Sequence, residues 1–261
     1  MINKKTYNPL VSIITPNFNG EAFLEKTIQS VINQTYQNIE YIVIDGGSTD
    51  GSHAIIERYK KFINYLKIEN DNGIFHAVDK GIKKSSGEYI IWINSDDILN
   101  PKAAENIVSI FKNNLNVSWI NGRCGYIKNN IQFSLIPYIY PRNYIENGKA
   151  HKKFYGYIQQ ESTSFRKSLY IESGGLDISK NSAGDYLLWQ KFSKITDLKT
   201  YFINIGYFRT HKNQVSANKD SFEKFTGHIS SKYDLNLIRL FLSLIFLPFV
   251  IIKTFIAKYL K

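Results

Sequence analysis

The stretch Gly87-Glu-Tyr-Ile-Ile-Trp-Ile-Asn-Ser-Asp-Asp-Ile-Leu-Asn-Pro101 decides the expected fold. Its continuous apolar run, Tyr89 to Ile93, follows a glycine and stops at a polar corner, which is typical of a strand covered on both faces. Asp96 and Asp97 come just after that strand. Ligands of an open α/β sheet bind beyond the carboxyl ends of its strands. A carboxylate pair at that place predicts a site for a hard divalent cation and, through the cation, for a diphosphate.

The chain before this corner alternates between expected strands and helices. The apolar patterns predict helices at residues 21–33, 52–62 and 74–84, and strands at residues 10–15, 40–44, 65–68 and 89–93. Strands that are separated by helices of this length form βαβ units and a parallel sheet. We therefore expect an α/β protein with a Rossmann-like, mostly parallel sheet flanked by helices.

Acidic or amide-rich loops follow each of these four strands. The side chains in question are Asn17 and Asn19, Asp45, Asp71, and the pair Asp96 and Asp97. Each loop alone has a plainer explanation as turn or cap chemistry, and Ser95 with Asp96 is a typical turn. Because parallel strands end at one edge of the sheet, the loops are expected to converge there. That convergence favours a ligand site over four unrelated turns.

The second half of the chain adds three candidate site residues. Asp185 stands near the start of a helix expected from residue 183, where it is either a helix cap worth about 1 kcal/mol or a general base. Arg209 and His211 follow a strand expected at residues 200–205. Arg209 is a candidate phosphate clamp and His211 a candidate metal ligand, although a lone histidine is more often a hydrogen-bonded surface residue.

The other elements expected in this half are two further helices, a β-meander and two strands. Their residue ranges are 103–111 and 167–173 for helices, 124–136 for the meander, and 118–120 and 159–166 for strands. Asn100 is expected to cap the helix that follows it, with Pro101 as the first helical residue.

Composition limits the class of protein. The chain has 261 residues, of which 43% are hydrophobic, enough for one large α/β domain with an appendage. Its single cysteine, Cys124, fits a reducing compartment, and no secretory signal is visible, so we expect a cytoplasmic location. The net charge is +11, but the lysines are scattered and no nucleic-acid-binding motif is present. We therefore expect no nucleic-acid partner.

Residues 220–261 form a tail of different character. Leu240 to Ile252 is apolar apart from Ser243, and residues 232–261 carry five basic residues against one acidic residue. The apolar run is shorter than the roughly 20 residues that span a bilayer. We expect a helix in the membrane interface, peripheral on the inner face of the cell membrane, with lysines at the head groups. A helix packed on the domain, an oligomer contact and a membrane span remain alternatives.

Five motifs occur in an order that resembles the family 2 glycosyltransferases, which have the GT-A fold. They are Val11-Ser-Ile-Ile-Thr-Pro-Asn-Phe-Asn19, Asn33-Gln-Thr-Tyr36, Asp45-Gly-Gly-Ser-Thr-Asp-Gly51, Asn94-Ser-Asp-Asp97 and Gly184-Asp-Tyr-Leu-Leu-Trp189. The resemblance covers roughly residues 9 to 215. It implies a GT-A domain at residues 1–219, with a nucleotide-binding half (1–100) and an acceptor-binding half (101–219). The Asp-Gly-Gly-Ser form is similar to enzymes that build bacterial surface polysaccharides.

The family's chemistry, by this resemblance, is the transfer of a sugar from a nucleoside-diphosphate sugar, here expected to carry UDP. It implies Mg²⁺ or Mn²⁺, inversion at the anomeric carbon, and a glycan or lipid-linked acceptor. Asp97 would be the main metal ligand, with Asp96 towards the metal and ribose, and Asp185 would deprotonate the acceptor hydroxyl. The nucleotide would be contacted by the loop residues Thr15, Pro16, Asn17 and Asn19, and by Asp45 and Asp71.

Two departures from the family pattern and two other hypotheses remain. Gly46 stands where many members have a second aspartate, which leaves the nucleotide base open, and Asp79 stands where many have asparagine, a position we expect to be structural. A nucleotidyltransferase would also use such a sheet, but the loop after the first strand lacks the basic residue that class needs. A carbohydrate-binding protein on a degenerate fold would be attractive if Asp97 or Asp185 were missing.

Overall fold

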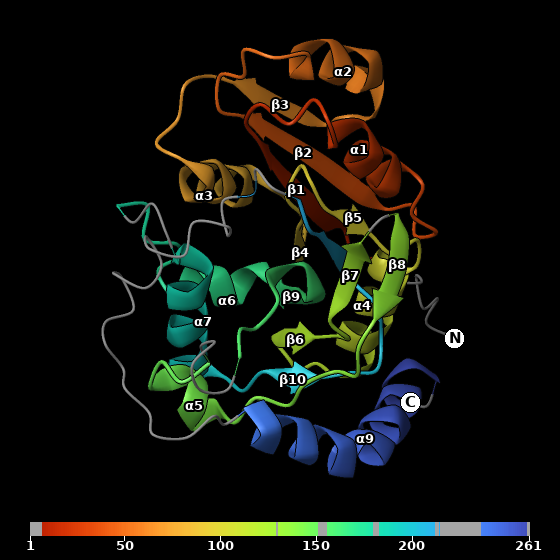
Figure 1. Ribbon diagram of the computed structural model, residues 1–261. Coiled ribbons are helices and arrows are strands. Elements are labelled where there is room, and N and C mark those ends of the chain that lie inside the picture. Colours follow the sequence, from red (N-terminus) through yellow and green to blue (C-terminus); the bar gives the residue numbers. More distant parts are fainter. Residues whose placement is uncertain are drawn as a thin grey trace.

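The computed structural model describes residues 7–128, 130–150, 156–179, 183–211, 214 and 236–259. The expected junction between the domain and the tail, at residues 219 and 220, lies outside the described residues, as does Asn129 in the turn of the meander. Figure 1 shows the sheet at the centre of the molecule and the long helix α9 along its underside.

The strands and helices follow the expected alternation. The strands are β1 Val11–Asn17, β2 Ile39–Asp45, β3 Tyr65–Ile68, β4 Tyr89–Trp92, β5 Ile98–Leu99, β6 Trp119–Asn121, β7 Gly125–Lys128, β8 Ile131–Ser134, β9 Thr163–Arg166, β10 Lys199–Thr200 and β11 Gly206–Arg209. The helices are α1 Leu24–Ile32, α2 Ser52–Tyr59, α3 Ile74–Lys84, α4 Ala103–Asn113, α5 Arg142–Glu146, α6 Lys167–Glu172, α7 Gly184–Ile195 and α9 Asn236–Tyr259, with 3₁₀ turns η1 Lys60–Phe62 and η2 Gln160–Ser162.

The main sheet has seven strands in the order β10-β6-β9-β4-β1-β2-β3. Strand β1 is parallel to β2 and β4, and β2 is parallel to β3. Strand β9 runs antiparallel between β4 and β6. The expected α/β architecture with a mostly parallel sheet is confirmed. A smaller sheet, β5-β11-β7-β8, stands beside the main one.

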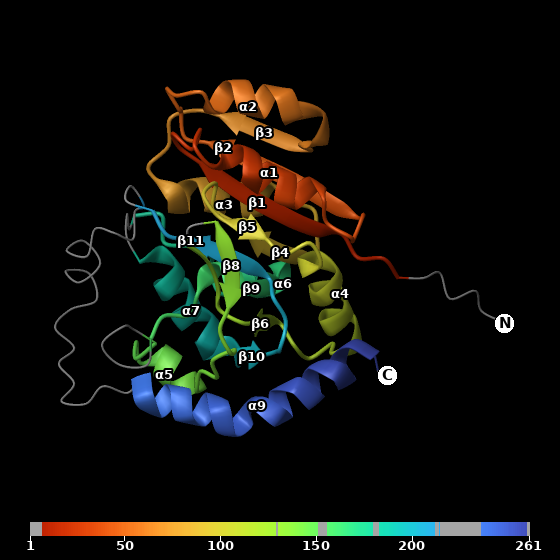
Figure 2. The same ribbon diagram turned by 45° about the vertical axis from the view of Figure 1, so that its right-hand side comes forward.

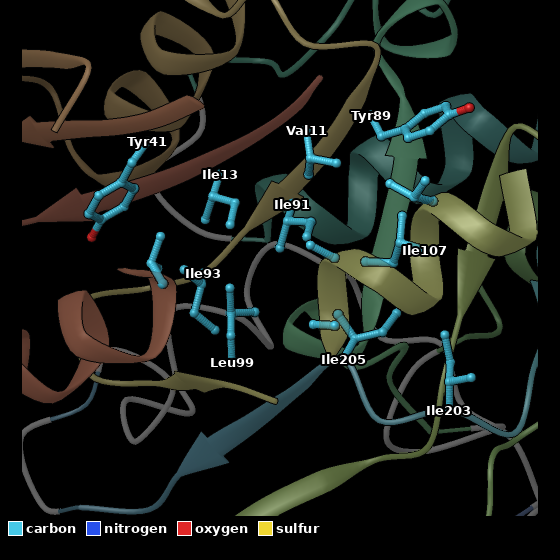
Figure 3. Close-up of a cluster of buried hydrophobic side chains, with 14 of the residues drawn as sticks. Val11, Ile13, Tyr41, Tyr89, Ile91, Ile93, Leu99, Ile107, Ile203 and Ile205 are labelled. Atoms are coloured by element: carbon cyan, nitrogen blue, oxygen red, sulfur yellow. The ribbon is translucent and has the colours of Figure 1, made fainter. Parts of the chain in front are cut away.

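Helices cover both faces of the main sheet because successive strand residues point to opposite sides. Val11, Ile13 and Ile91 pack with α1, α2 and α4 on one face, in the cluster that Figure 3 shows. Ile14 and Ile90 pack with α3, α6 and α7 on the other face. Both faces of the central strands are therefore buried, which explains why β4 reads as a continuous apolar run.

Two expected strands and one expected cap are wrong in detail. Residues 200–205 do not form a strand: β10 ends at Thr200 and β11 begins at Gly206. Tyr201, Ile203 and Ile205 are buried in the connection between the two sheets, and this burial produces the alternating pattern without a strand. Residues 160–162 form the turn η2, so β9 begins only at Thr163.

Asn100 does not cap helix α4. Its Oδ1 accepts a hydrogen bond from the backbone N of Lys102 at 3.0 Å, and Lys102 is the residue that precedes the helix. Asn100 and Pro101 therefore shape the turn before α4, and the residue that precedes the helix lies two positions later than expected.

Asp79 links two helices, as its expected structural role requires. It lies on α3, is 5% exposed, and accepts a hydrogen bond from the Tyr170 hydroxyl of α6 at 2.7 Å. Its other oxygen lies 2.8 Å from Lys83 Nζ, a lysine exposed to solvent. A buried aspartate with these partners offers a matched control for substitutions at the site described next.

Candidate active site

The loops after β1, β2, β3 and β4 meet at one edge of the main sheet because these strands are parallel. The paired register places Asn17 beside Asp45 where β1 and β2 end. The start of α7 and the strand β11 approach the same edge from the second half of the chain (Figure 2).

Asp45 organises the loop after β2. Its carboxylate is fully buried and accepts hydrogen bonds from the backbone N of Ser48 at 2.8 Å and from Asn17 Nδ2 at 2.6 Å. His53 Nε2 lies 3.2 Å from it. Burial alone would raise the pKa of Asp45, but the hydrogen bonds from Ser48, Asn17 and His53 outweigh it and lower the pKa. Asp45 therefore stays ionised and holds the loop in shape.

Thr15 and Pro16 are the two residues of β1 that come directly before Asn17. Both residues are buried in β1, and Thr15 Oγ1 accepts a hydrogen bond from the Tyr41 hydroxyl at 3.2 Å. Asn19 is exposed in this loop, has a positive φ of 50°, and accepts a hydrogen bond from the backbone N of Thr49 at 2.8 Å. Of the residues expected in this loop, Asn17 and Asn19 reach the loop after β2.

Asp71 lies over the glycine that departs from the family pattern. A Cβ atom on Gly46 would stand only 2.9 Å from Asp71 Oδ2, and Asp71 Oδ1 accepts a hydrogen bond from the backbone N of Gly73 at 2.8 Å. The space that a second aspartate would need is thus taken by a carboxylate from the neighbouring loop. This close approach brings Asp71 into the group around Asp45.

Asp97 is held at the end of β4 with one oxygen unused. The residue is 1% exposed, and its Oδ1 accepts a hydrogen bond from the backbone N of Arg209 at 2.8 Å. Its Oδ2 is buried and has no hydrogen-bond donor among the described residues. Thr27 Oγ1 fixes the corner from below, 2.7 Å from the carbonyl oxygen of Asp97. Turn chemistry accounts for the backbone here, but it leaves the Asp97 carboxylate oxygen available for a ligand.

Arg209 and His211 both contact Asp96, the neighbour of Asp97. Arg209 is 7% exposed, donates from Nε to the Asp96 carbonyl at 2.8 Å, and lies 4.9 Å from the centre of the Phe23 ring. Its Nη2 is buried without an acceptor in the described parts of the chain. Burial lowers the pKa of Arg209, although the charges of Asp97 and Asp96 oppose this shift. His211 Nε2 is 2.9 Å from Asp96 Oδ2. Arg209 itself belongs to β11 and not to the loop expected there.

Asp185 is the second residue of α7. The residue before the helix is Ala183, with a φ of 61°, and no side chain caps the helix, so the cap explanation of Asp185 is wrong. A Cβ atom on Gly184 would lie 2.6 Å from the ring of Phe75, which packs edge-on against Trp92 at 6.0 Å. Gly184 thus lets α7 begin against α3 and the end of β4. Burial raises the pKa of Asp185.

Glu161 is a site residue that the sequence reasoning missed. It is 5% exposed in η2, and its charge acts on the carboxyl group of Asp97. Burial first, and then the charges of Asp96 and Asp185, raise the pKa of Glu161 to about 7. Burial and the charges of Glu161 and Asp96 also raise the pKa of Asp97. The four carboxylates are therefore close enough for the charge of one to shift the pKa of another.

These residues fit a divalent cation that a ligand helps to hold. No three His, Cys, Asp or Glu side chains form a metal-binding group within the described residues. Asp97 offers its unused oxygen and Asp96 lies beside it. Mg²⁺ is commonly held by one or two carboxylates together with substrate phosphates and water. The protein alone does not enclose a metal, and the donor set suits one that binds together with a diphosphate.

Glu161→Gln tests this buried pair through stability. The pKa of Glu161 rises from 4.5 to about 7 on folding, so the stability it contributes is present below pH 4.5 and is lost as pH rises through about 7. We expect the metal-free variant to be more stable than wild type at pH 8, by about 3 kcal/mol at most, with a smaller difference at pH 5. Thermal unfolding at both pH values measures this, with Glu57→Gln on the exposed face of α2 as control. If the variant is less stable than wild type at both pH values, the ionised Glu161 does not destabilise the fold.

The family is decided by a match over most of the chain. Residues 12–172 match the sequence model of glycosyl transferase family 2. The chain belongs to this family. An uncharacterized glycosyltransferase of Rickettsia typhi is 31% identical over 201 residues, which cover 76% of this chain and 63% of the relative. This chain thus spans less than two thirds of the length of that relative. A Bacillus subtilis glycosyltransferase assigned to teichuronic acid biosynthesis is 35% identical over 94 residues, 35% of this chain and 37% of its own length.

Solved structures confirm the expected GT-A glycosyltransferase fold. Staphylococcus aureus TarS (residues 1–349) in complex with UDP-GlcNAc has a TM-score of 0.65 and 16% identity, over 80% of this chain and 60% of that one. The mannosyltransferase PcManGT of Pyrobaculum calidifontis, in complex with GDP-Man and Mn²⁺, has a TM-score of 0.60 and 17% identity, over 97% of this chain and 74% of its own.

Proposed function

We propose that this family 2 protein transfers a sugar from a nucleoside-diphosphate sugar to an acceptor hydroxyl, with a divalent metal and with inversion at the anomeric carbon. UDP is the nucleotide we expect, and the acceptor is a growing glycan or a lipid-linked glycan in bacterial surface polysaccharide synthesis. TarS binds UDP-GlcNAc, and the Bacillus relative is assigned to teichuronic acid synthesis. Both support this choice of donor and pathway class.

The observation that carries the proposal is that two carboxylates from separate segments, Asp97 and Asp185, lie at the same edge of the main sheet. Asp97, after β4, has a buried oxygen without a donor among the described residues. Asp185, at the start of α7, comes from another part of the chain, and its charge acts on the same buried Glu161 as that of Asp96. A base and a metal ligand on separate segments suit a displacement in which the acceptor and the leaving diphosphate lie on opposite sides of the sugar.

Asp185 would take the proton of the acceptor hydroxyl. The oxygen of that hydroxyl forms the new bond to the anomeric carbon, the bond from that carbon to the diphosphate oxygen breaks, and the nucleoside diphosphate leaves with the electron pair. One displacement of this kind inverts the anomeric carbon. Because burial raises the pKa of Asp185, its carboxylate is a stronger base than an exposed aspartate.

Asp97, Asp96 and His211 would hold the metal, and Arg209 would face the diphosphate. A bound Mg²⁺ or Mn²⁺ would supply positive charge beside the diphosphate, whose negative charge grows as it departs. The buried, unpaired Nη2 of Arg209 is suited to bind a phosphate oxygen. Asn17, Asn19, Asp45 and Asp71 would form the nucleotide side of the site. PcManGT carries GDP-Man and Mn²⁺ on the same fold.

We further propose that the enzyme works on the inner face of the cell membrane. The segment Leu240–Tyr259 has a mean hydropathy of 2.4 and is long and apolar enough, by length and composition alone, to cross a membrane. Only 22% of it is buried. A lipid-linked acceptor would be reached most readily by an enzyme held at that surface.

Release of nucleoside diphosphate from a panel of UDP-, GDP- and dTDP-sugars, with and without Mn²⁺, tests the catalytic proposal. Slow, metal-dependent hydrolysis of one donor is expected even without acceptor, and it would also identify the donor. Calorimetry on the same panel separates the outcomes. No release and no binding of any donor would favour the carbohydrate-binding hypothesis, and pyrophosphate release would favour a nucleotidyltransferase.

A further inference from the structure

Helix α9 is fastened to the catalytic domain along its length by polar groups. Thr254 Oγ1 accepts a hydrogen bond from the backbone N of Phe202 at 2.7 Å, and Ser243 Oγ accepts one from that of Ile139 at 3.4 Å. At the far end, Asn113 of α4 donates to the carbonyl of Ala257 at 2.9 Å. Figures 1 and 2 both show α9 lying flat beneath α5, β10 and α4. A helix that crossed a bilayer would have to give up these bonds.

The outer side of α9 is covered with large apolar side chains. Those exposed by more than a third are Leu240, Phe241, Leu244, Ile245, Phe246, Phe249, Ile251, Ile252, Phe255, Ile256 and Tyr259. A soluble surface seldom carries so many adjacent large apolar residues. Flat attachment and an apolar outer side together are the features of a helix that lies in a membrane interface.

A basic cavity opens beside this helix. It has a volume of about 400 Å³, and its wall includes Arg142, Lys199 and Lys253 but only one carboxylate, Asp197. Lys199 Nζ is 2.7 Å from Asp197 Oδ2, and Arg142 Nη1 is 3.8 Å from Asp197 Oδ1. Lys253 lies over the ring of Tyr201 at 4.2 Å, with no carboxylate partner among the described residues. The cavity therefore has an excess of two positive charges.

The apolar wall of the cavity is continuous with the outer side of α9. Phe246 and Phe249 line the cavity and are also 43% and 67% exposed. Burial first, and then the charge of Lys199, lower the pKa of Lys253 to about 8. An anion in the cavity would offset both effects.

We propose that this cavity binds the phosphate group of an anionic phospholipid, with the acyl chains lying along Phe246, Phe249 and the outer side of α9. The excess positive charge matches the phosphate, and the adjoining apolar side matches the hydrocarbon. A second copy of the chain fits less well, because it would bring an equally basic cavity to the interface. The proposal rests on the membrane location proposed above, and it is independent of the transfer reaction.

Vesicle binding by the full-length chain tests the proposal. Vesicles of phosphatidylcholine alone are compared with vesicles that contain phosphatidylglycerol, by co-sedimentation at fixed salt. Wild type is expected to prefer the anionic vesicles by about tenfold or more, and Lys199→Gln/Lys253→Gln to lose most of that preference. The control Lys60→Gln/Lys61→Gln removes the same charge just after α2, at the opposite end of the molecule (Figure 1), and should change binding less than twofold.

Two further variants and a measurement of donor hydrolysis complete the test. Arg142→Gln/Lys199→Gln removes two of the basic side chains of the cavity and leaves the contact of Lys253 with the Tyr201 ring in place. It replaces the first variant if that variant unfolds. Phe246→Ser/Phe249→Ser should weaken binding to both kinds of vesicle. Donor hydrolysis by the cavity variants should stay within twofold of wild type.

The outcomes separate the ideas. If the cavity variant and the control lose the preference for anionic vesicles equally, the cavity is not the lipid site, and only the proposal of membrane binding remains. No binding to any vesicle would overturn both membrane proposals, and concentration-dependent dimerisation without vesicle binding would assign α9 to a second copy. Full displacement by millimolar inorganic phosphate, with the free ion bound at the cavity, would assign the cavity to a soluble anion and overturn the lipid. None of these results would bear on sugar transfer.

Discussion

Asp185→Asn is expected to lower the rate of sugar transfer by about a thousandfold while leaving donor binding within about twofold. Asparagine keeps the shape of the side chain at the start of α7 but cannot accept the proton of the acceptor hydroxyl. Steady-state kinetics with a matched acceptor, and calorimetry with the donor and Mn²⁺, measure the two quantities separately.

The pH dependence of the transfer rate of the wild-type enzyme tests the role of Asp185 in a second way. Burial raises the pKa of Asp185, and a base works only when it is unprotonated. Transfer should therefore fall as pH drops through a value above the usual aspartate range. The control is Asp79→Asn, which alters a buried aspartate away from the edge and introduces the residue that many family members carry. If Asp79→Asn lowers the transfer rate as much as Asp185→Asn does, the loss in Asp185→Asn cannot be assigned to a catalytic base.

Asp97→Asn is expected to abolish the metal-dependent part of donor affinity, about a hundredfold or more, without lowering stability. Asn is a weaker ligand for Mn²⁺ than a carboxylate, so the diphosphate loses its bridge to the protein. Calorimetry with the donor, with and without Mn²⁺, measures the loss, and the affinity of the variant should no longer respond to the metal.

The stability of Asp97→Asn should stay the same or rise, whereas its donor affinity falls. Burial, with the charges of Glu161 and Asp96, raises the pKa of Asp97, so the stability this group contributes at low pH is lost as pH rises. Without metal, Asp97→Asn should thus unfold at the same or a higher temperature than wild type at pH 8. This combination of lost binding and retained stability is typical of a residue kept for function. A variant that loses both in parallel would instead make Asp97 a structural residue.

The sequence predicts the first hundred residues well because their local patterns agree with their place in the sheet. The bounds of β3 and α3 are correct to the residue, since a turn-rich loop separates a short, mostly apolar run from a strongly amphipathic helix. The convergence of Asp45, Asp71 and Asp97 follows from parallel strand direction alone. These inferences need only local periodicity and one rule of sheet geometry.

The second half is harder because its decisive contacts are distant in sequence. Glu161 lies in a stretch that reads as a plain strand, and only its burial beside Asp97 makes it part of the site. An acidic residue within an otherwise buried segment is the one signal that could have drawn attention to it. The break between β10 and β11 has no local signal, since Tyr201, Ile203 and Ile205 are buried with the alternation of a strand.

Strand β9 limits how such enzymes can be recombined. It comes from the second half of the chain, yet it bonds to β4 on one side and β6 on the other, and Glu161 precedes it by two residues. A chimera that exchanges residues 1–100 alone would leave a foreign β4 to pair with the original β9, and a foreign Asp97 beside the charge of the original Glu161. Donor choice cannot then be grafted as a cassette cut at residue 100. An exchange that carries η2 and β9 with the donor half keeps these partners together, and it defines where the two halves can be separated by an engineer or by gene rearrangement.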